Sequence, residues 1–146
     1  MPSNTFLSAE EKEQIVTAIK NAEGKSPGEI KVYFEKRCNK KVEERITEIF
    51  HRLKMHETEL RTGVLIYVAY LDKVFAILGD KGIYEKVPVH FWDETRSLME
   101  IDFREGRFAA GLIKGINLSG EQLRKYFGPM KENTNEISDD IIIADD

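Results

Sequence analysis

The sequence contains one cysteine, few histidines and no long hydrophobic segment. Because Cys38 is the only cysteine in 146 residues, an intramolecular disulfide and a cysteine-rich zinc site are both excluded. No apolar run approaches the roughly 20 residues that a membrane-spanning helix needs. The first residues, MPSNTFLSAEEKEQ, lack the basic start and the apolar segment of a secretory signal. We therefore expect a cytoplasmic protein with no membrane insertion.

The chain also lacks an excess of positive charge. Its formal net charge is -4, and residues 128–146 hold six acidic residues against one lysine. The preceding residues therefore carry 20 acidic and 21 basic side chains and are close to neutral. Such a balance does not provide the basic field that nucleic-acid binding requires, so we expect no nucleic-acid partner.

The composition divides the chain into one folded domain, residues 1–127, and an acidic tail, residues 128–146. Because the tail is short and strongly charged, the prediction favours disorder there. The alternative is that its segment ISDDIIIADD adds as a strand to an exposed sheet edge, either of a partner or of this chain.

Hydrophobic periodicity predicts four helices and three strands in the body. Ser8 and Glu11 have capping-box spacing at the start of the first helix. The helices are expected over 8–24, 40–55, 89–106 and 108–127, and the strands over 29–38, 63–70 and 74–79. This order indicates an α/β fold, a three-layer α/β/α sandwich with a small mixed β-sheet and helices on both faces.

The stretch GDKG, residues 79–82, directly follows the last predicted strand. With a parallel first pair and an antiparallel third strand, residues 27–29, 61–63 and 79–82 should share one edge of the sheet. Oxygen ligands at this edge would suit Ca²⁺ or Mg²⁺. The candidate metal ligands are Asp80, Glu29, Glu57, Glu59 and Glu85. The alternative is that Asp80 only caps a turn and the glutamates are solvated surface.

Familiar catalytic motifs are absent from the sequence. Arg45 stands one position too late after Cys38 for a Cys-x₅-Arg phosphatase loop, and there is no Gly-x-Ser-x-Gly elbow, phosphate-binding loop or EF-hand. Among the histidines, His56 directly precedes the candidate ligands Glu57 and Glu59 and is retained as a candidate ligand or acid–base group. Trp92 is expected to anchor the third helix in the core.

Four segments together resemble the TPM domain, a family of thylakoid-lumen, photosystem-associated and nematode receptor-regulating proteins: SAEEKEQIVTAIKNAEGKSPGEIKVYFE, HETELRTGVLIYVA, FAILGDKGIYEKVP and FREGRFAAGLIKGI. The resemblance covers about residues 7–127 and extends to the stand-alone bacterial form, whose polar tails carry a stretch like NEISDD. It implies an α/β/α sandwich and links to stress response, photosystem repair, divalent-metal binding and acid phosphatase activity.

Carried onto this chain, the family's loops match residues 61–63 and 79–82, with Asp80 the clearest ligand. Many relatives have an acidic or amide residue where Thr62 stands here, so one ligand is weakened.

Three functions follow as hypotheses. The first is a TPM-domain protein, linked to stress response by the resemblance, that binds Ca²⁺ or Mg²⁺ at the edge formed by residues 27–29, 61–63 and 79–82. The second is a metal-dependent phosphatase in which the metal activates water and Lys81 or Arg61 holds the phosphate. The third is a metal-free module whose acidic tail binds a protein partner.

Overall fold

The computed structural model describes residues 7–24, 28–128 and 141–144. The elements follow one another as α1 (Ala9–Glu23), β1 (Glu29–Glu35), α2 (Val42–Arg52), the short 3₁₀ helix η1 (Met55–Glu57), β2 (Gly63–Ala69), β3 (Val74–Gly79), α3 (Lys81–Tyr84), α4 (Phe91–Arg104), α5 (Phe108–Phe127) and β4 (Ile141–Ile143). The predicted elements are all present, η1 and α3 are added to them, and β4 lies in the tail segment for which a strand was the alternative prediction.

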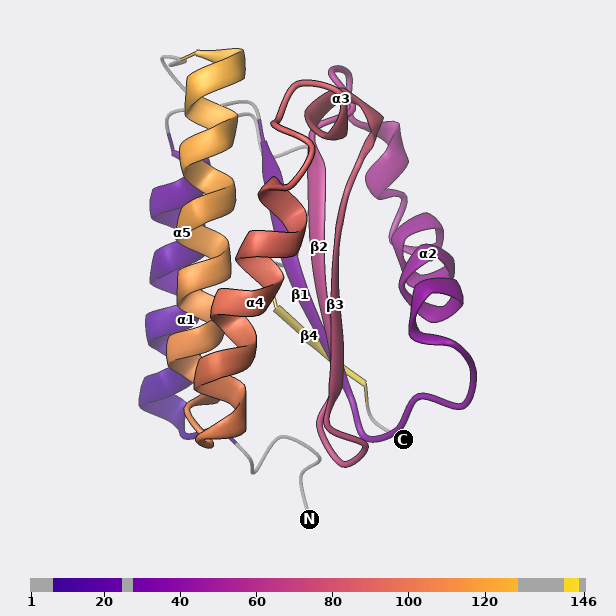
Figure 1. Ribbon diagram of the computed structural model, residues 1–146, viewed down its shortest axis with the longest axis vertical. Helices are drawn as coiled ribbons and strands as arrows, with labels where there is room; N and C mark the ends of the chain where they lie inside the picture. The colour runs from indigo at the N-terminus through magenta and orange to yellow at the C-terminus, as the bar shows by residue number, and fades with distance from the viewer. Residues whose placement is uncertain (1–6, 25–27, 129–140, 145–146) are drawn as a thin grey trace.

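The sheet confirms the predicted architecture. Its strand order is β3-β2-β1-β4, with β1 parallel to β2 and β4 and with β3 antiparallel to β2. Helices α1, α4 and α5 cover one face of the sheet and α2 covers the other, which makes three layers (Figure 1). The chain therefore has an α/β/α fold built on a mixed sheet.

The two central strands are buried along their whole length. Successive side chains of a strand point to opposite faces, so Val32 and Ile66 join the core under α1, α4 and α5, whereas Tyr33 and Tyr67 join the core under α2. Burial also includes the polar residues of β1 that share the face of Tyr33.

The first helix begins as its sequence predicts. The Ser8 amide donates to Glu11 Oε1 at 2.8 Å, and the Glu11 amide donates to Ser8 Oγ at 3.0 Å, which completes the capping box. The second helix is shorter than predicted. It ends at Arg52 because Lys54 adopts a left-handed conformation with φ 59°, after which the chain continues as η1.

The glycines of α5 pack against neighbouring helices. A Cβ added at Gly111 would lie 2.5 Å from Phe103 of α4, and one added at Gly120 would lie 2.7 Å from Ala22 of α1. The missing side chains therefore let α5 fit between α1 and α4, the helices that flank it in Figure 1.

Part of the acidic tail is a strand. Ile141–Ile143 pairs with Val32–Phe34 in β1, and the Ala144 amide donates to the Phe34 carbonyl at 2.8 Å. For these residues the favoured expectation of disorder does not hold, and the alternative of addition to the chain's own sheet does. Residues 129–140 and 145–146 lie outside the described part, where the prediction of disorder stays a prediction. Among the described helices, none has the length and apolarity needed to cross a membrane.

Candidate functional site at the edge beside α3

The predicted juxtaposition of residues 27–29, 61–63 and 79–82 at one end of the strands is present for the described residues, and Gly63 lies at its centre. Glu29 is the register partner of Gly63 on one side, and on the other side the Asp80 amide donates to the Gly63 carbonyl at 2.8 Å. Alternation along β1 places Glu29 on the face of Tyr33, which is the α2 side. Asp80 has extended backbone angles and follows Leu78 onto the same side. The backbones of Glu29 and Asp80 are therefore about two strand spacings apart, or roughly 10 Å.

Asp80 is held by Arg61. The Arg61 guanidinium donates from Nε to Asp80 Oδ2 at 2.7 Å and from its terminal nitrogen to Oδ1 at 2.9 Å. The Asp80 side chain is 6% exposed, whereas that of Arg61 is 45% exposed. The hydrogen bonds and the negative charge of Asp80 raise the pKa of Arg61 above its usual range. Arg61 reaches Asp80 from a left-handed backbone conformation with φ 57°.

Asp80 also caps α3, as the simpler of the two predictions proposed. Its Oδ1 accepts from the Lys81 amide at 2.8 Å, which satisfies a donor at the first turn of the helix. Both carboxylate oxygens of Asp80 are therefore already engaged within the protein.

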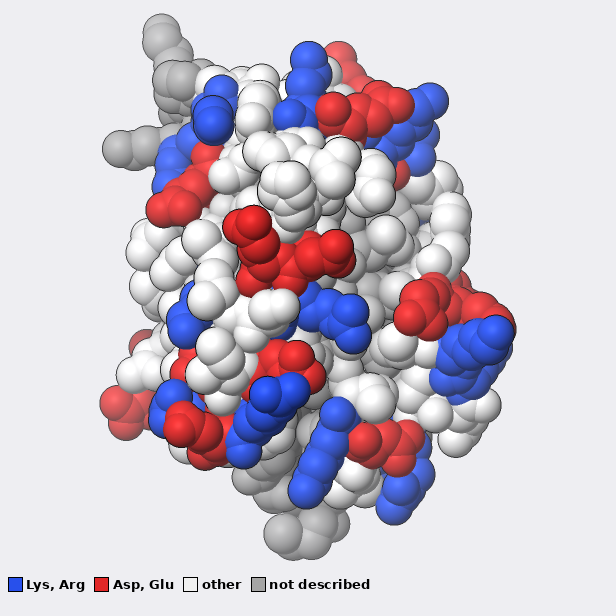
Figure 2. Space-filling view, viewed as in Figure 1, with Lys and Arg blue, Asp and Glu red and all other residues white. Residues whose placement is uncertain are grey.

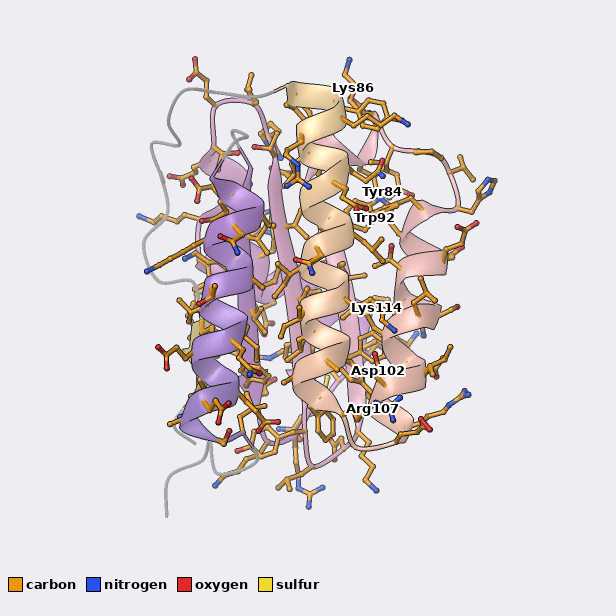
Figure 3. The ribbon with its side chains drawn as sticks, turned by 90° about the vertical axis from the view of Figure 1, so that its left-hand side faces the viewer. Tyr84, Lys86, Trp92, Asp102, Arg107 and Lys114 are labelled. Atoms are coloured by element: carbon orange, nitrogen blue, oxygen red, sulfur yellow. The ribbon has the colours of Figure 1, made fainter. Side chains whose placement is uncertain are left out.

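The two glycines of GDKG are needed for close packing. A Cβ at Gly82 would lie 2.1 Å from the Leu60 carbonyl oxygen, and a Cβ at Gly79 would lie 2.5 Å from the Trp92 ring. Trp92 is partly buried against the main core, which agrees with its predicted anchoring role. Figure 3 places Trp92 and Tyr84 toward the α3 end of the molecule. The turn therefore presses α3 against the loop that carries Arg61.

The other predicted ligands do not converge on Asp80. Glu57 and Glu59 are exposed in and after η1, and Glu85 is exposed at the end of α3. Within residues 7–24, 28–128 and 141–144, no group of three or more His, Cys, Asp or Glu is arranged to hold a metal ion. The predicted carboxylates as placed do not fit a preformed Ca²⁺ or Mg²⁺ centre. Of the five, only Glu29 and Asp80 are strand neighbours of Gly63.

His56 lies in η1, close to another histidine. Its ring centroid is 4.7 Å from that of His51, and its Nε2 is 3.7 Å from Glu57 Oε2. Its Nδ1 is buried with no hydrogen-bond partner among the described residues. These contacts do not bring His56 into a metal-holding group with Asp80, and its role as a ligand stays a prediction.

A buried polar cluster at the opposite end of β1 was missed by the sequence analysis. Glu35 accepts from Arg45 Nε at 2.9 Å and from its terminal nitrogen at 2.8 Å, and it also accepts from the Tyr67 hydroxyl. Burial raises the pKa of Glu35, but the hydrogen bonds from Arg45 and Tyr67 outweigh it and leave the pKa below the ordinary 4.5. The cluster joins β1, β2 and α2. The sequence indicated it only through the position of Glu35, which is two residues after Tyr33 and therefore points to the same face of β1.

A second set of ion pairs fixes the junction of α4 and α5. Asp102, which is nearly buried, accepts from Arg107 at 2.9 Å and is 3.0 Å from Lys114 Nζ. In Figure 3, Asp102 and Arg107 lie in the half of the molecule away from Tyr84, and Lys114 lies next to them toward the middle. All their charges are paired locally, so the cluster stabilises the helix junction.

Comparison with known proteins identifies the family. A model of the TPM domain matches residues 3–122. The chain belongs to the TPM domain family. The solved NMR structure of BA42 from the psychrophilic bacterium Bizionia argentinensis is 45% identical, with a TM-score of 0.89 and coverage of 97% of each chain. The resemblance stated from the sequence is thereby confirmed.

Two more distant solved structures share the fold alone. The N-terminal domain of a P. gingivalis protein has 15% identity and a TM-score of 0.71, covering 86% of this chain and 81% of its own. The N-terminal domain of cg2496 from Corynebacterium glutamicum has 13% identity and a TM-score of 0.63, covering 80% and 74%. No curated protein matches the chain.

Proposed function

We propose that this TPM-domain protein binds a divalent cation, Ca²⁺ or Mg²⁺, at Asp80 by exchange with Arg61. One observation carries the proposal: Asp80, a nearly buried carboxylate, already binds a cationic group through both oxygens. The Arg61 side chain is nearly half exposed, so it can move into water when a metal ion replaces it. Exchange would keep the carboxylate neutralised in both states.

The expected affinity is low. Arg61 must be displaced, and Glu29 is the only other predicted ligand flanking Gly63, so most of the coordination shell would be backbone oxygen and water. Glu57, Glu59 and Glu85 are exposed and do not converge on Asp80, so they add no direct ligand in this arrangement. Protein sites with few charged ligands have dissociation constants of about 10⁻⁴–10⁻³ M. We expect a value in this range for Ca²⁺.

The test is an amide NMR titration of the chelator-stripped protein with CaCl₂ and then MgCl₂. Saturable shifts are expected at residues 28–29, 57–63 and 79–85. Asp80→Asn should abolish them, and it should still fold because asparagine caps a helix as well as aspartate does. Arg61→Gln should tighten binding several-fold, because the competing positive charge is removed while a polar side chain remains.

Asp93→Asn is the matched control, because Asp93 is an exposed acid in the first turn of α4. It should bind the cation like the wild-type protein. No saturable shift up to about 10 mM, tenfold above the weakest expected dissociation constant, would refute the proposal. Shifts restricted to the acidic tail would refute it as well.

The phosphatase hypothesis gains no support from this geometry. Arg61 is bound to Asp80, and Lys81 is exposed at the first position of a four-residue helix. We therefore do not advance catalysis as the function.

A further inference from the structure

Strand β3 forms one edge of the sheet and is unusually apolar for that position. Its six residues, VFAILG, contain no charge and no proline, which are the usual means of blocking an edge strand. Five of the six are exposed or partly exposed. The described part of the chain therefore presents an edge to which another strand could add.

The backbone of β3 is suitably oriented for such pairing. Antiparallel ladders alternate between hydrogen-bonded and non-bonded residue pairs. Since Asp80 bonds to Gly63, the alternation places Leu78 and Ala76 in bonded pairs with β2. The N–H and C=O groups of Phe75 and Ile77 are then directed away from the sheet.

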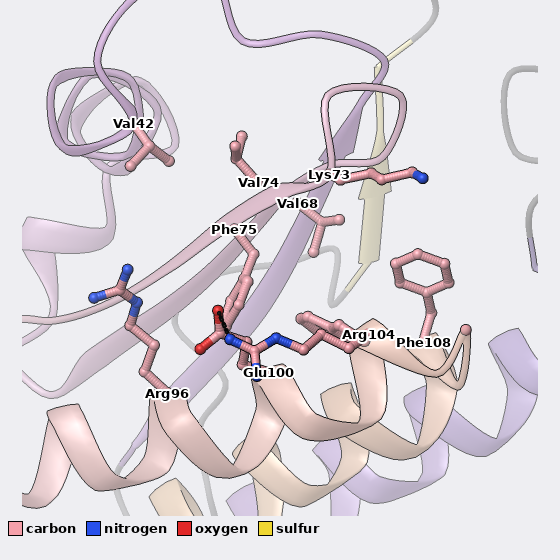
Figure 4. A pocket seen from close by; sticks show the side chains of 11 residues that line it. Val42, Val68, Lys73, Val74, Phe75, Arg96, Glu100, Arg104 and Phe108 are labelled. Atoms are coloured by element: carbon pink, nitrogen blue, oxygen red, sulfur yellow. Dashed lines mark ion pairs between the residues drawn. The ribbon is translucent and has the colours of Figure 1, made fainter.

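A hollow of about 690 Å³ runs along this edge. On the α2 side its wall includes Val42, and on the α4 side it includes the aromatic rings of Phe75, Phe103 and Phe108. Figure 4 shows β3 passing between the α2 wall and the α4 wall. A strand sends its side chains alternately to opposite faces, so walls on both faces suit an extended peptide better than a compact small molecule.

The charge around the hollow is positive. Lys73, Arg96 and Arg104 line it against a single acid, Glu100, whose Oε2 lies 3.3 Å from Arg104. Arg96 and Arg104 extend from the α4 wall in Figure 4. In Figure 2, uncharged surface lies between the charged groups of α4 and those of α2. An apolar strand flanked by acidic residues complements this surface.

We propose that the β3 edge binds an extended segment of a partner protein, apolar in its centre and acidic on both sides, as an added strand. The chain already contains one example of this chemistry. Ile141–Ile143, flanked in the sequence by two pairs of aspartates, adds to β1 at the other edge of the same sheet. Strand addition supplies affinity through main-chain hydrogen bonds, and the arginines select for acidic neighbours.

The probe is the synthetic peptide ISDDIIIADD with blocked ends, titrated into isotope-labelled full-length protein in the presence of chelator. The chelator separates this test from cation binding. Saturable amide shifts are expected at Val74–Gly79, with slower hydrogen exchange at Phe75 and Ile77. A peptide with proline in place of the central isoleucine lacks the required N–H and should lose binding. A peptide with lysine in place of the aspartates should bind at least tenfold more weakly.

Protein variants test the charge requirement. Arg96→Glu and Arg104→Glu should each weaken binding several-fold, whereas Arg124→Glu, which changes an exposed arginine near the end of α5, should not. All three side chains are exposed, and a dispersed NMR spectrum will verify that each variant folds.

Several results would overturn the proposal. The absence of saturable shifts at β3, or equal binding of the proline peptide, would exclude strand addition there. Shifts at Val32–Phe34 with release of Ile141–Ile143 would show that the peptide replaces β4 and pairs with β1 instead. Shifts at β3 that depend on protein concentration without peptide would assign the edge to a second copy of this chain.

Discussion

Replacing Gly82 with alanine should destabilise the domain, because the added Cβ would lie 2.1 Å from the Leu60 carbonyl oxygen and 2.5 Å from that of Arg61. Ordinary contact begins at 3.4 Å, so the loop would have to retreat by about 1.3 Å, the difference from 2.1 Å. Backbone oxygens cannot rotate aside as a flexible side chain can. The Ile83 amide bond to the Arg61 carbonyl, already 3.3 Å long, would be lost.

The magnitude follows from opposing effects. Overpacking costs about 1–3 kcal/mol, and a lost backbone hydrogen bond costs about 0.5–1.5 kcal/mol. Replacing glycine with alanine in a helix stabilises the folded state by about 0.5–1 kcal/mol, which partly offsets these losses. The free energy of unfolding should therefore fall by about 0.5–4 kcal/mol, with about 2 kcal/mol the central value, out of a total of about 5–15 kcal/mol for a typical domain. For a chain of this size, each kcal/mol lowers Tm by about 2–4 °C.

Urea unfolding followed by Trp92 fluorescence and far-ultraviolet circular dichroism measures this change. Trp92 is the only tryptophan and packs beside Gly79, so its emission reports on this end of the domain. Gly24→Ala is the matched control, because Gly24 is right-handed with φ -57° and its added Cβ would lie 3.1 Å from the Lys20 carbonyl oxygen, so a shift of only about 0.3 Å restores ordinary contact. It should stay within about 0.5 kcal/mol of wild type. An equally small effect for Gly82→Ala would refute the close-packing argument.

Two further changes test the sheet. The pKa of Glu35 is lower in the folded chain than its ordinary 4.5, so its stabilising contribution is present above pH 4.5 and is lost as the pH falls through the folded pKa. Glu35→Gln should therefore cost about 1–3 kcal/mol at pH 7. This is less than the roughly 3–5 kcal/mol for breaking a buried ion pair, because Arg45 keeps its ion pair with Glu48. The substitution should also flatten the acid dependence of urea unfolding. Ile142→Pro removes a ladder N–H and should speed hydrogen exchange along β4 while leaving β2 protected; equal protection at β4 would contradict the pairing.

The layers of the fold were predictable because they follow from local patterns. The capping box at Ser8, the apolar run 63–69 and the short return to 74–79 each specify an element. The right-handed crossover rule then fixes a parallel β1–β2 pair, and the hairpin fixes an antiparallel β3. These constraints were enough to place residues 29, 63 and 80 at one edge, as the structure has them.

The partner of Asp80 was not predictable from the same patterns. Arg61 reaches it from a left-handed conformation, and no glycine or asparagine marks that position in the sequence. The acidic residues near the edge therefore indicated a metal site, although one of them already has a protein cation beside it. Burial of Glu35 was missed for a related reason. The sequence pattern does not show which side chains meet across the layers, and it is Arg45 of α2 and Tyr67 of β2 that bind the Glu35 carboxylate.

The two edges of the sheet are protected by different means, and the difference implies selectivity. At β1 the chain supplies its own strand, Ile141–Ile143. At β3 the strand carries no charge, and the positive residues stand beside it, on the hairpin turn at Lys73 and on α4 at Arg96 and Arg104. Two copies meeting at β3 would bring these positive charges together, which disfavours edge-to-edge association. The same positive charges would attract an acidic strand. The arrangement therefore selects an incoming strand by its charge, while the outward N–H and C=O groups of β3 remain available for pairing.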